Sequence, residues 1–296
     1  MDVEGAQSAR EPSTDLRGTG ASDAWRLGRG RRVAVRVLAL LGLLTLNFMI
    51  VFVISDAAGR GGQEHVLEPP GSVEAQIGAD HPGEAVHLVG ALAALALGAS
   101  GLVGLIIQPD RAGSATEAGA AAVAWLLAAA IVGDPDNYGG QAGPVDLAFA
   151  VLALPTLAAA LIAAPWRAWR RGGVSRPRFL LLAGLGLPWV LHAVEQGLMQ
   201  RNTWPPLADP HHQAHWFVAS LVAFMTVLVV AGGALAGRGW RVATITAGTA
   251  GLGVAVASLL APEAASALHP VWAGAAGLWG AGTLAVTWHE WRRVPE

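Results

Sequence analysis

Long apolar runs separated by short polar segments are the dominant pattern along the chain. The first run, 33–55, has 23 residues, and a helix of that length crosses the roughly 30 Å of hydrocarbon in a membrane. Seven more runs follow. The eight runs cover residues 33–55, 83–107, 116–132, 144–164, 179–200, 214–236, 242–260 and 269–288. The pattern therefore predicts an all-α fold, a polytopic integral membrane bundle of eight transmembrane helices.

The segment before the first run has the opposite character. Residues 1–30 are polar and rich in Gly, Ser, Asp and Arg, so they lack the apolar surface that would offset the entropy of ordering. We expect a disordered cytoplasmic tail over 1–30 and a transmembrane domain over 31–296.

Charge distribution sets the orientation. The chain is 53% hydrophobic and 14% charged, with a mean hydropathy of +0.47, which is typical of membrane proteins. All 19 basic residues are Arg, and 17 of them fall on one side if the tail is cytoplasmic. The positive-inside rule then predicts a multi-pass protein of the cell membrane with both termini cytoplasmic, and with segments 56–82 and 201–213 outside.

Two missing residue types narrow the chemistry. The chain has no Cys, which excludes disulfides, thiolate metal sites and cysteine nucleophiles. It has no Lys, which excludes a lysine Schiff base and a phosphate-binding P-loop. We therefore expect the lipid bilayer as a partner, and neither a nucleotide nor a nucleic acid.

A faint internal repeat accompanies the eight runs. Asp80 and Asp209 are 129 positions apart, each ahead of a run with matched apolar positions, and similar offsets relate the next two pairs of runs. The repeat predicts two parallel four-helix halves, 33–165 and 178–289. Short matches between apolar segments also arise by chance, so unrelated halves remain the alternative.

The candidate chemistry gathers at the outer face, where eight of the nine His fall. The pairs His211 with His215, His192 with Glu195, and Glu84 with His87 each share a helix face by their spacing. Pro188 adds a predicted kink one turn before His192. We expect a common site built by His87, His192, Glu195, His211, His215 and His269, with Glu84 as a further ligand.

Imidazole and carboxylate ligands suit Zn, Fe, Mn or Cu(II), and two imidazoles from different helices can also hold a haem. The leading hypothesis is a metal- or haem-binding protein with a redox or metal-handling role at the extracytoplasmic face. One alternative is a membrane-embedded metal-dependent hydrolase in which Glu195 or Glu84 activates water. The other is a proton-coupled transporter without metal.

Simpler interpretations compete with these. His65, His81 and His212 fit solvated loop positions. Glu84 fits a favourable carboxylate at a helix N-terminus, and His192 with Glu195 fits a structural hydrogen-bonded pair between helices. If the imidazoles are ligands, function should fall between about pH 7 and about pH 5, because protons compete with the cofactor for neutral imidazole.

Two short patterns resemble known families. His212 and His215 form a His-x-x-His that resembles one element of the copper-resistance membrane proteins, although the Trp-Gly-Gly that continues that element is missing. His211 and His215 form a His-x-x-x-His similar to one element of the membrane-embedded zinc hydrolases related to alkaline ceramidase, without their Ser-x-x-x-His. Each resemblance covers a few residues and identifies no family.

Overall fold

The computed structural model describes residues 27–60, 83–132, 144–163, 176–202, 210–235, 240–264 and 267–293. Within these ranges every regular element is an α-helix, which confirms the all-α part of the predicted fold. The helices are α1 (Arg29–Arg60), α3 (Gly83–Ile107), α4 (Ala112–Val132), α5 (Pro144–Ala163), α6 (Arg176–Leu185), α7 (Leu187–Asn202), α8 (Pro210–Leu235), α9 (Trp240–Leu260) and α10 (Pro270–Arg293).

Each predicted apolar run coincides with a helix, and the fifth is divided between α6 and α7. Proline marks several helix starts: α5, α8 and α10 all begin on one. Proline suits this position because its fixed φ is already helical and its missing N–H would have no partner in the first turn.

The break between α6 and α7 confirms the kink predicted at Pro188. Proline has no N–H to donate to the carbonyl four residues earlier, and the helix is interrupted at Gly186. A side chain from α10 fixes the bend, because Trp279 Nε1 donates a 2.7 Å hydrogen bond to the Leu182 carbonyl. The same indole meets Trp189 edge to face, with 6.3 Å between the ring centroids.

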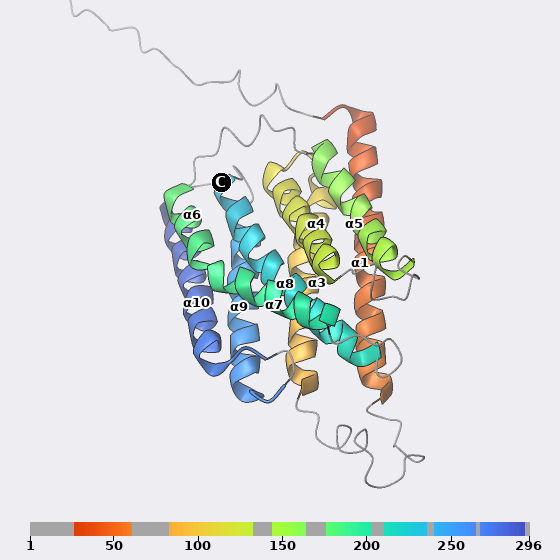
Figure 1. The fold of residues 1–296 in the computed structure, drawn as a ribbon. Coiled ribbons are helices and arrows are strands. Elements are labelled where there is room, and N and C mark those ends of the chain that lie inside the picture. Colours follow the sequence, from red (N-terminus) through yellow and green to blue (C-terminus); the bar gives the residue numbers. More distant parts are fainter. Residues whose placement is uncertain are drawn as a thin grey trace, which may run out of the picture.

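Four helices form the centre of the bundle. Helices α3, α4, α8 and α9 pack on one another, α1 and α5 cover one side, and α6, α7 and α10 cover the other. Helices α6 and α7 run in the same general direction as two parts of one bent segment, with α7 crossing obliquely, and the other successive helices alternate in direction. Helix α1 therefore begins and α10 ends at the upper end of Figure 1. Helices α3, α8 and α10 all begin at the lower end.

The central helices approach closely where small residues meet. A Cβ built on Gly101 of α3 would lie 2.6 Å from the backbone nitrogen of Ala118 of α4. Between α9 and α10, a Cβ on Gly280 would lie 2.8 Å from the Gly248 carbonyl oxygen. Only glycine permits such contacts, which are common where membrane helices pack.

The start of α1 is tied to the turn between α3 and α4. The backbone N–H of Leu27 donates to Asp110 at 3.0 Å, and Arg32 forms a 3.3 Å ion pair with the same carboxylate. Farther along α1, Arg36 donates to the Ile106 carbonyl at 3.0 Å, near the end of α3. These contacts order residues 27–30, the last part of the predicted tail; residues 1–26 lie outside the described part of the chain.

Three helices of the described part are long and apolar enough to cross a membrane, not the eight that the sequence pattern predicts. Their spans are Leu88–Ile107, Ala112–Ile131 and Arg241–Leu260. Two shorter apolar stretches, Val151–Ala163 and Phe217–Gly232, lie in α5 and α8. The break at Gly186 also shortens the helices that replace the fifth run.

Candidate functional site

The predicted site residues lie on several helices, and the structure describes them unevenly. The side chains of Glu84, His87, His211 and His215 lie outside its described part, although their helices are placed. His269 is exposed just before α10, and His192 is half-buried on α7. Among residues with described side chains no group of three metal-ligating residues comes together, so the common six-residue site stays a prediction.

Helices α3 and α8 contact each other about two helical turns from their first residues, which lie at the lower end of the bundle in Figure 1. A Cβ built on Gly90 would lie 3.4 Å from Cγ1 of Val218. His87 precedes Gly90 by three positions, and His215 precedes Val218 by three. Positions three apart share a helix face. Because α3 and α8 run in the same direction, both His positions fall one turn nearer the lower end, on the faces by which these two helices meet.

A shift of 128 positions relates several contacts in the two halves. It converts His87 into His215 and Gly90 into Val218. It also relates two contacts of other types. Val89 lies 3.6 Å from a Cβ built on Gly253. The shift converts Val89 into Phe217, and the reverse shift converts Gly253 into Trp125. The rings of Phe217 and Trp125 also meet, edge to face, with 5.5 Å between their centroids.

The helix starts follow nearly the same shift. Helices α3 and α8 begin at Gly83 and Pro210, and α4 and α9 begin at Ala112 and Trp240. Helices α5 and α10 begin at 144 and 270. The three offsets are therefore 127, 128 and 126 positions, close to the 129 positions found between the aspartates ahead of α3 and α8.

Helix α7 separates the predicted pair of His192 and Glu195. Its buried face consists of Trp189, Ala193, Gln196 and Gly197. His192 borders this face and is half-buried, whereas Glu195 and Met199 are exposed. The structure therefore brings His192, but not Glu195, against the bundle.

The register of α7 on α8 places His192 deeper than His215. A Cβ on Gly197 would lie 3.4 Å from Oγ of Ser220, so these two positions are level. His192 precedes Gly197 by five positions on α7, and His215 precedes Ser220 by five positions on α8. Because α7 and α8 run in opposite directions, His192 lies above this level in Figure 1 and His215 lies below it. At 1.5 Å per residue the two levels differ by up to about 15 Å, and a metal ion shared by His192 and His215 stays a prediction.

The loop before α10 lies against the beginning of α3. Val86 is buried with Ala257 of α9 and with Ala261, the first residue after α9, and Ala264 and Ala267 of the loop pack on this group. The backbone N–H of Leu268 donates to Ser258 Oγ at 3.1 Å, which fixes the chain next to His269. His269 therefore lies at the same end of the bundle as His87.

Two buried polar residues were missed from the sequence. Glu117 of α4 is only 2% exposed and forms a hydrogen bond with Ser100 of α3. Gln196 of α7 is 4% exposed, and its Oε1 has no partner among the described residues. Glu117 carried a usable signal, because it is the only carboxylate in the predicted run 116–132.

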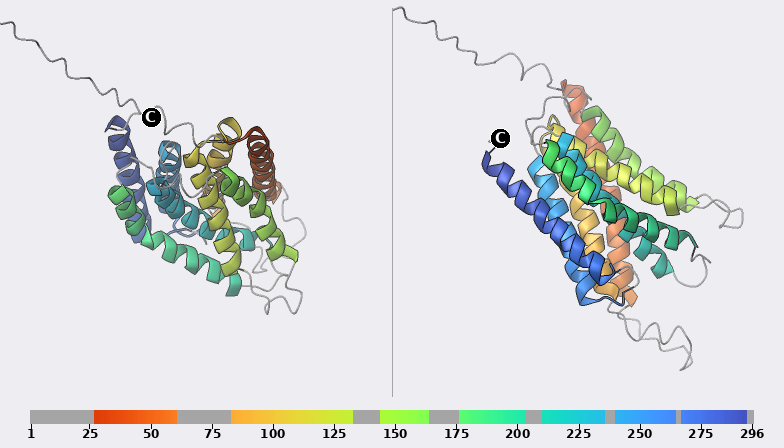
Figure 2. Two further views of the ribbon diagram at one scale, coloured as in Figure 1. Left: turned by 90° about the horizontal axis from the view of Figure 1, so that it is seen from above. Right: turned by 60° about the vertical axis from the view of Figure 1, so that its left-hand side comes forward.

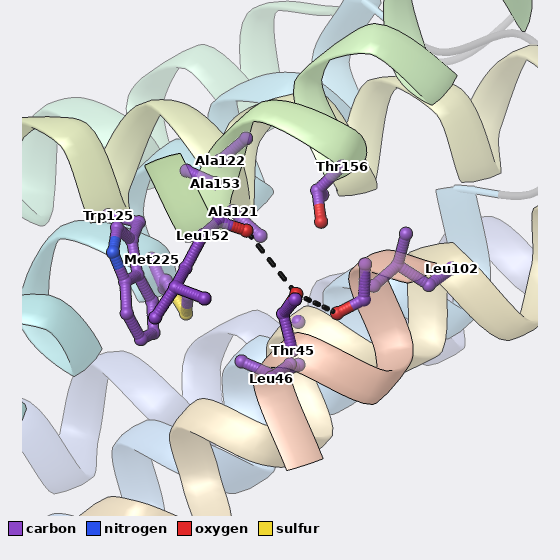
Figure 3. Close-up of a pocket in the computed structure, with 12 residues that line it drawn as sticks. Thr45, Leu46, Leu102, Ala121, Ala122, Trp125, Leu152, Ala153, Thr156 and Met225 are labelled. Atoms are coloured by element: carbon purple, nitrogen blue, oxygen red, sulfur yellow. Dashed lines mark hydrogen bonds between the residues drawn. The ribbon is translucent and has the colours of Figure 1, made fainter. Parts of the chain in front are cut away.

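One described cavity lies between α1, α3, α4, α5 and α8, and Figure 3 shows its lining. Its volume is about 20 Å³, which is room for one water molecule. Thr45 Oγ1 shares its proton between the carbonyls of Gly42 and Leu152, at 2.9 and 3.3 Å. None of the predicted ligands lines this cavity.

Comparison with protein-family models, with curated proteins and with solved structures found no match to this chain.

Proposed function

We propose that this chain is an eight-span integral membrane protein with both termini on the cytoplasmic side. Peripheral helices carry large apolar side chains that point away from the bundle, such as Leu161 of α5 at 67% exposed and Leu278 of α10 at 78%. A soluble surface rarely exposes so many such side chains, whereas lipid tails accommodate them. The alternating helix directions and the concentration of Arg at one end of the bundle support the orientation.

The two halves are proposed to be parallel copies of one four-helix unit. The supporting observation is the shift of 128 positions, which relates helix starts, the Gly90–Val218 contact and the pair of contacts made by Val89 and Phe217. Four helices per copy place equivalent residues at the same end of the bundle, as in parallel transporter repeats. A local twofold axis then passes between α3 and α8.

The function proposed for this axis is binding of a transition metal ion or a haem at the extracytoplasmic end. One observation supports it: the Gly90–Val218 contact lies one helical turn inside the positions of His87 and His215, which precede Gly90 and Val218 by three residues. Each helix offers a second ligand at helical spacing, Glu84 on α3 and His211 on α8. Such a set fits Zn, Fe, Mn or Cu(II), and two opposed imidazoles fit the axial positions of a haem.

The bound group would provide a redox centre or a metal-handling site next to the external solvent. The residues of the chain would hold and orient the bound group, and the surrounding apolar helices would limit the access of water to it. His269 is available as an additional ligand from α10. The deeper level of His192 and the exposed position of Glu195 favour a site that does not depend on them.

Metal analysis and a visible absorption spectrum of the purified protein test the proposal. The parent should contain close to one metal ion or haem per chain, or per axis in a larger assembly. His87→Ala and His215→Ala should each lose most of it, while His289→Ala, at an exposed position near the opposite end, should retain it. A parent protein without metal or haem after preparation in metal-supplemented medium, or equal content in all four proteins, would refute the proposal.

A further inference from the structure

Glu117 is a buried carboxyl group that the proposed metal site does not use. It lies in α4, within the span Ala112–Ile131, and is 2% exposed. At 1.5 Å per residue it is about 8 Å from the first residue of α4, at the end where α1 begins and α10 ends. Ionisable residues in such surroundings are costly and usually functional.

Ser100 of α3 is a hydrogen-bond partner that can either donate to Glu117 or accept from it. Its Oγ is in hydrogen-bond contact with Oε1 of Glu117 and also lies 3.3 Å from the carbonyl oxygen of Leu97. A hydroxyl has one proton to donate and also accepts. When Glu117 is protonated, the carboxyl donates to Ser100 and Ser100 donates to Leu97. When Glu117 is ionised, the Ser100 hydroxyl rotates and donates to the carboxylate. Both protonation states are therefore hydrogen-bonded without movement of the backbone.

The surrounding helices bury Glu117 closely. Next to the pair, Gly101 approaches the backbone of Ala118, and a Cβ on Gly104 would overlap the side chain of Ser114. The described side chains of α3, α5 and α8 include no titratable group. On the other elements that contact α4, the charged or titratable residues with described side chains are His192, Glu195 and Arg201 of α7 and Arg241 of α9.

Glu117 and Ser100 lie nearer the end of the bundle where α4 begins and α3 ends than the opposite end. Arg111 immediately precedes α4, six positions before Glu117. Ser100 itself is half-buried and not fully enclosed. The group that exchanges its proton is therefore near the end of the bundle that we place in the cytoplasm.

We propose that Glu117 and Ser100 form a reversible proton-binding site in the cytoplasmic half of the bundle. The proton is taken up from the solvent at that end, is held between Oε1 of Glu117 and Oγ of Ser100, and returns to solvent when Glu117 ionises. This site is independent of the proposed metal site, since it is built by different residues at the opposite end. It would allow the chain to respond to, or to carry, protons on the cytoplasmic side.

Infrared difference spectroscopy of the full-length protein in a lipid bilayer tests the proposal, because a protonated carboxyl has its own C=O stretching band. Between about pH 4 and about pH 10, the parent should show a buried carboxyl band that disappears as pH rises. Glu117→Gln should remove that band, and Ser100→Ala should shift both its frequency and its titration midpoint. Glu195→Gln, an exposed carboxyl on α7, should leave it unchanged.

Two outcomes would overturn the proposal. One is that the Glu117→Gln spectrum matches that of the parent across the pH range, or that the band of Glu117 is present or absent throughout, since the carboxyl would then not exchange its proton. The other is that the band disappears on addition of Na⁺ at constant pH, since the site would then bind a metal cation in place of a proton.

Discussion

Replacing Gly101 by Ala should weaken the packing of α3 on α4. The added Cβ would lie 2.6 Å from the nitrogen and 3.0 Å from the Cα of Ala118. Both are backbone atoms and cannot rotate away, so the helices would have to separate by about 1 Å to reach ordinary van der Waals distance. Overpacking of this kind costs about 1–3 kcal/mol.

Helix propensity acts in the opposite direction. Alanine is favoured over glycine inside a helix by about 0.5–1 kcal/mol. The net loss expected for Gly101→Ala is therefore about 1–2 kcal/mol. Gly282 in α10 is the matched control, because a Cβ there would have no neighbour within 4 Å. Gly282→Ala should leave the free energy of unfolding unchanged or raise it by about 0.5–1 kcal/mol.

The measurement is the free energy of unfolding in mixed micelles, followed by circular dichroism as a denaturing detergent is added. Gly101→Val should lose more stability than Gly101→Ala, because its larger side chain forces a wider separation. If Gly101→Ala were as stable as Gly282→Ala, or if the loss did not grow with side-chain size, the close approach of α3 and α4 would be refuted.

Three further predictions concern other parts of the molecule. Trp279→Phe removes the donor to the Leu182 carbonyl and should lower the free energy of unfolding by about 1–2 kcal/mol, whereas Trp272→Phe, at a half-exposed indole, should change it little in the same titration. A Cys introduced at Ser72 or Thr203 into this Cys-free chain should react with an impermeant maleimide in intact cells; reaction only after the membrane is opened would reverse the proposed orientation. Metal or haem content should fall as external pH drops through about 6.5, because ligation requires neutral imidazole and protons then compete with the metal for the ring nitrogen. A content that stays constant to about pH 5 would argue against imidazole ligands.

The helices were predictable because their apolar runs are long. The run at 83–107 coincides with α3, and the bend near Pro188 followed from the missing proline N–H. Membrane crossing is less well determined, because length and hydropathy are averaged over a whole segment. Helix α10, for example, is rich in Gly and Ala and has lower mean hydropathy than α3, so it is not among the described helices that are apolar enough to cross a membrane.

Glu117 shows how a small boundary error hides a buried group. The sequence pattern starts the third run at residue 116, which makes Glu117 a favourable carboxylate in the first helical turn. Helix α4 instead begins four residues earlier, at Ala112, so Glu117 lies beyond the first turn and is covered by α3. Helix ends are set by local hydrogen bonds that hydropathy does not report.

The face of α7 illustrates a second limit. His192 and Glu195 share a stripe by spacing, but a helix with apolar residues on all sides does not reveal which stripe is buried. The structure selects the stripe through Trp189, Ala193 and Gln196, which leaves Glu195 exposed. By contrast, a weak repeat was visible in the sequence at an offset of 129 positions, one more than the shift that relates His87 to His215, and the Gly90–Val218 contact gives that repeat a spatial meaning.

The break between α6 and α7 has a consequence for how the protein enters the membrane during synthesis. Helix α6 has 10 residues and α7 has 16, so at 1.5 Å per residue they extend about 15 Å and about 24 Å, each less than the roughly 30 Å of hydrocarbon. Neither piece alone can serve as a stop-transfer segment, and the first begins with two Arg within three residues. Insertion of this bent segment therefore depends on partners. Helix α8 contacts both pieces, and Trp279 of α10 completes the bend, so in the membrane protein proposed above α8 and α10 must be synthesised before α6 and α7 can settle in their final positions.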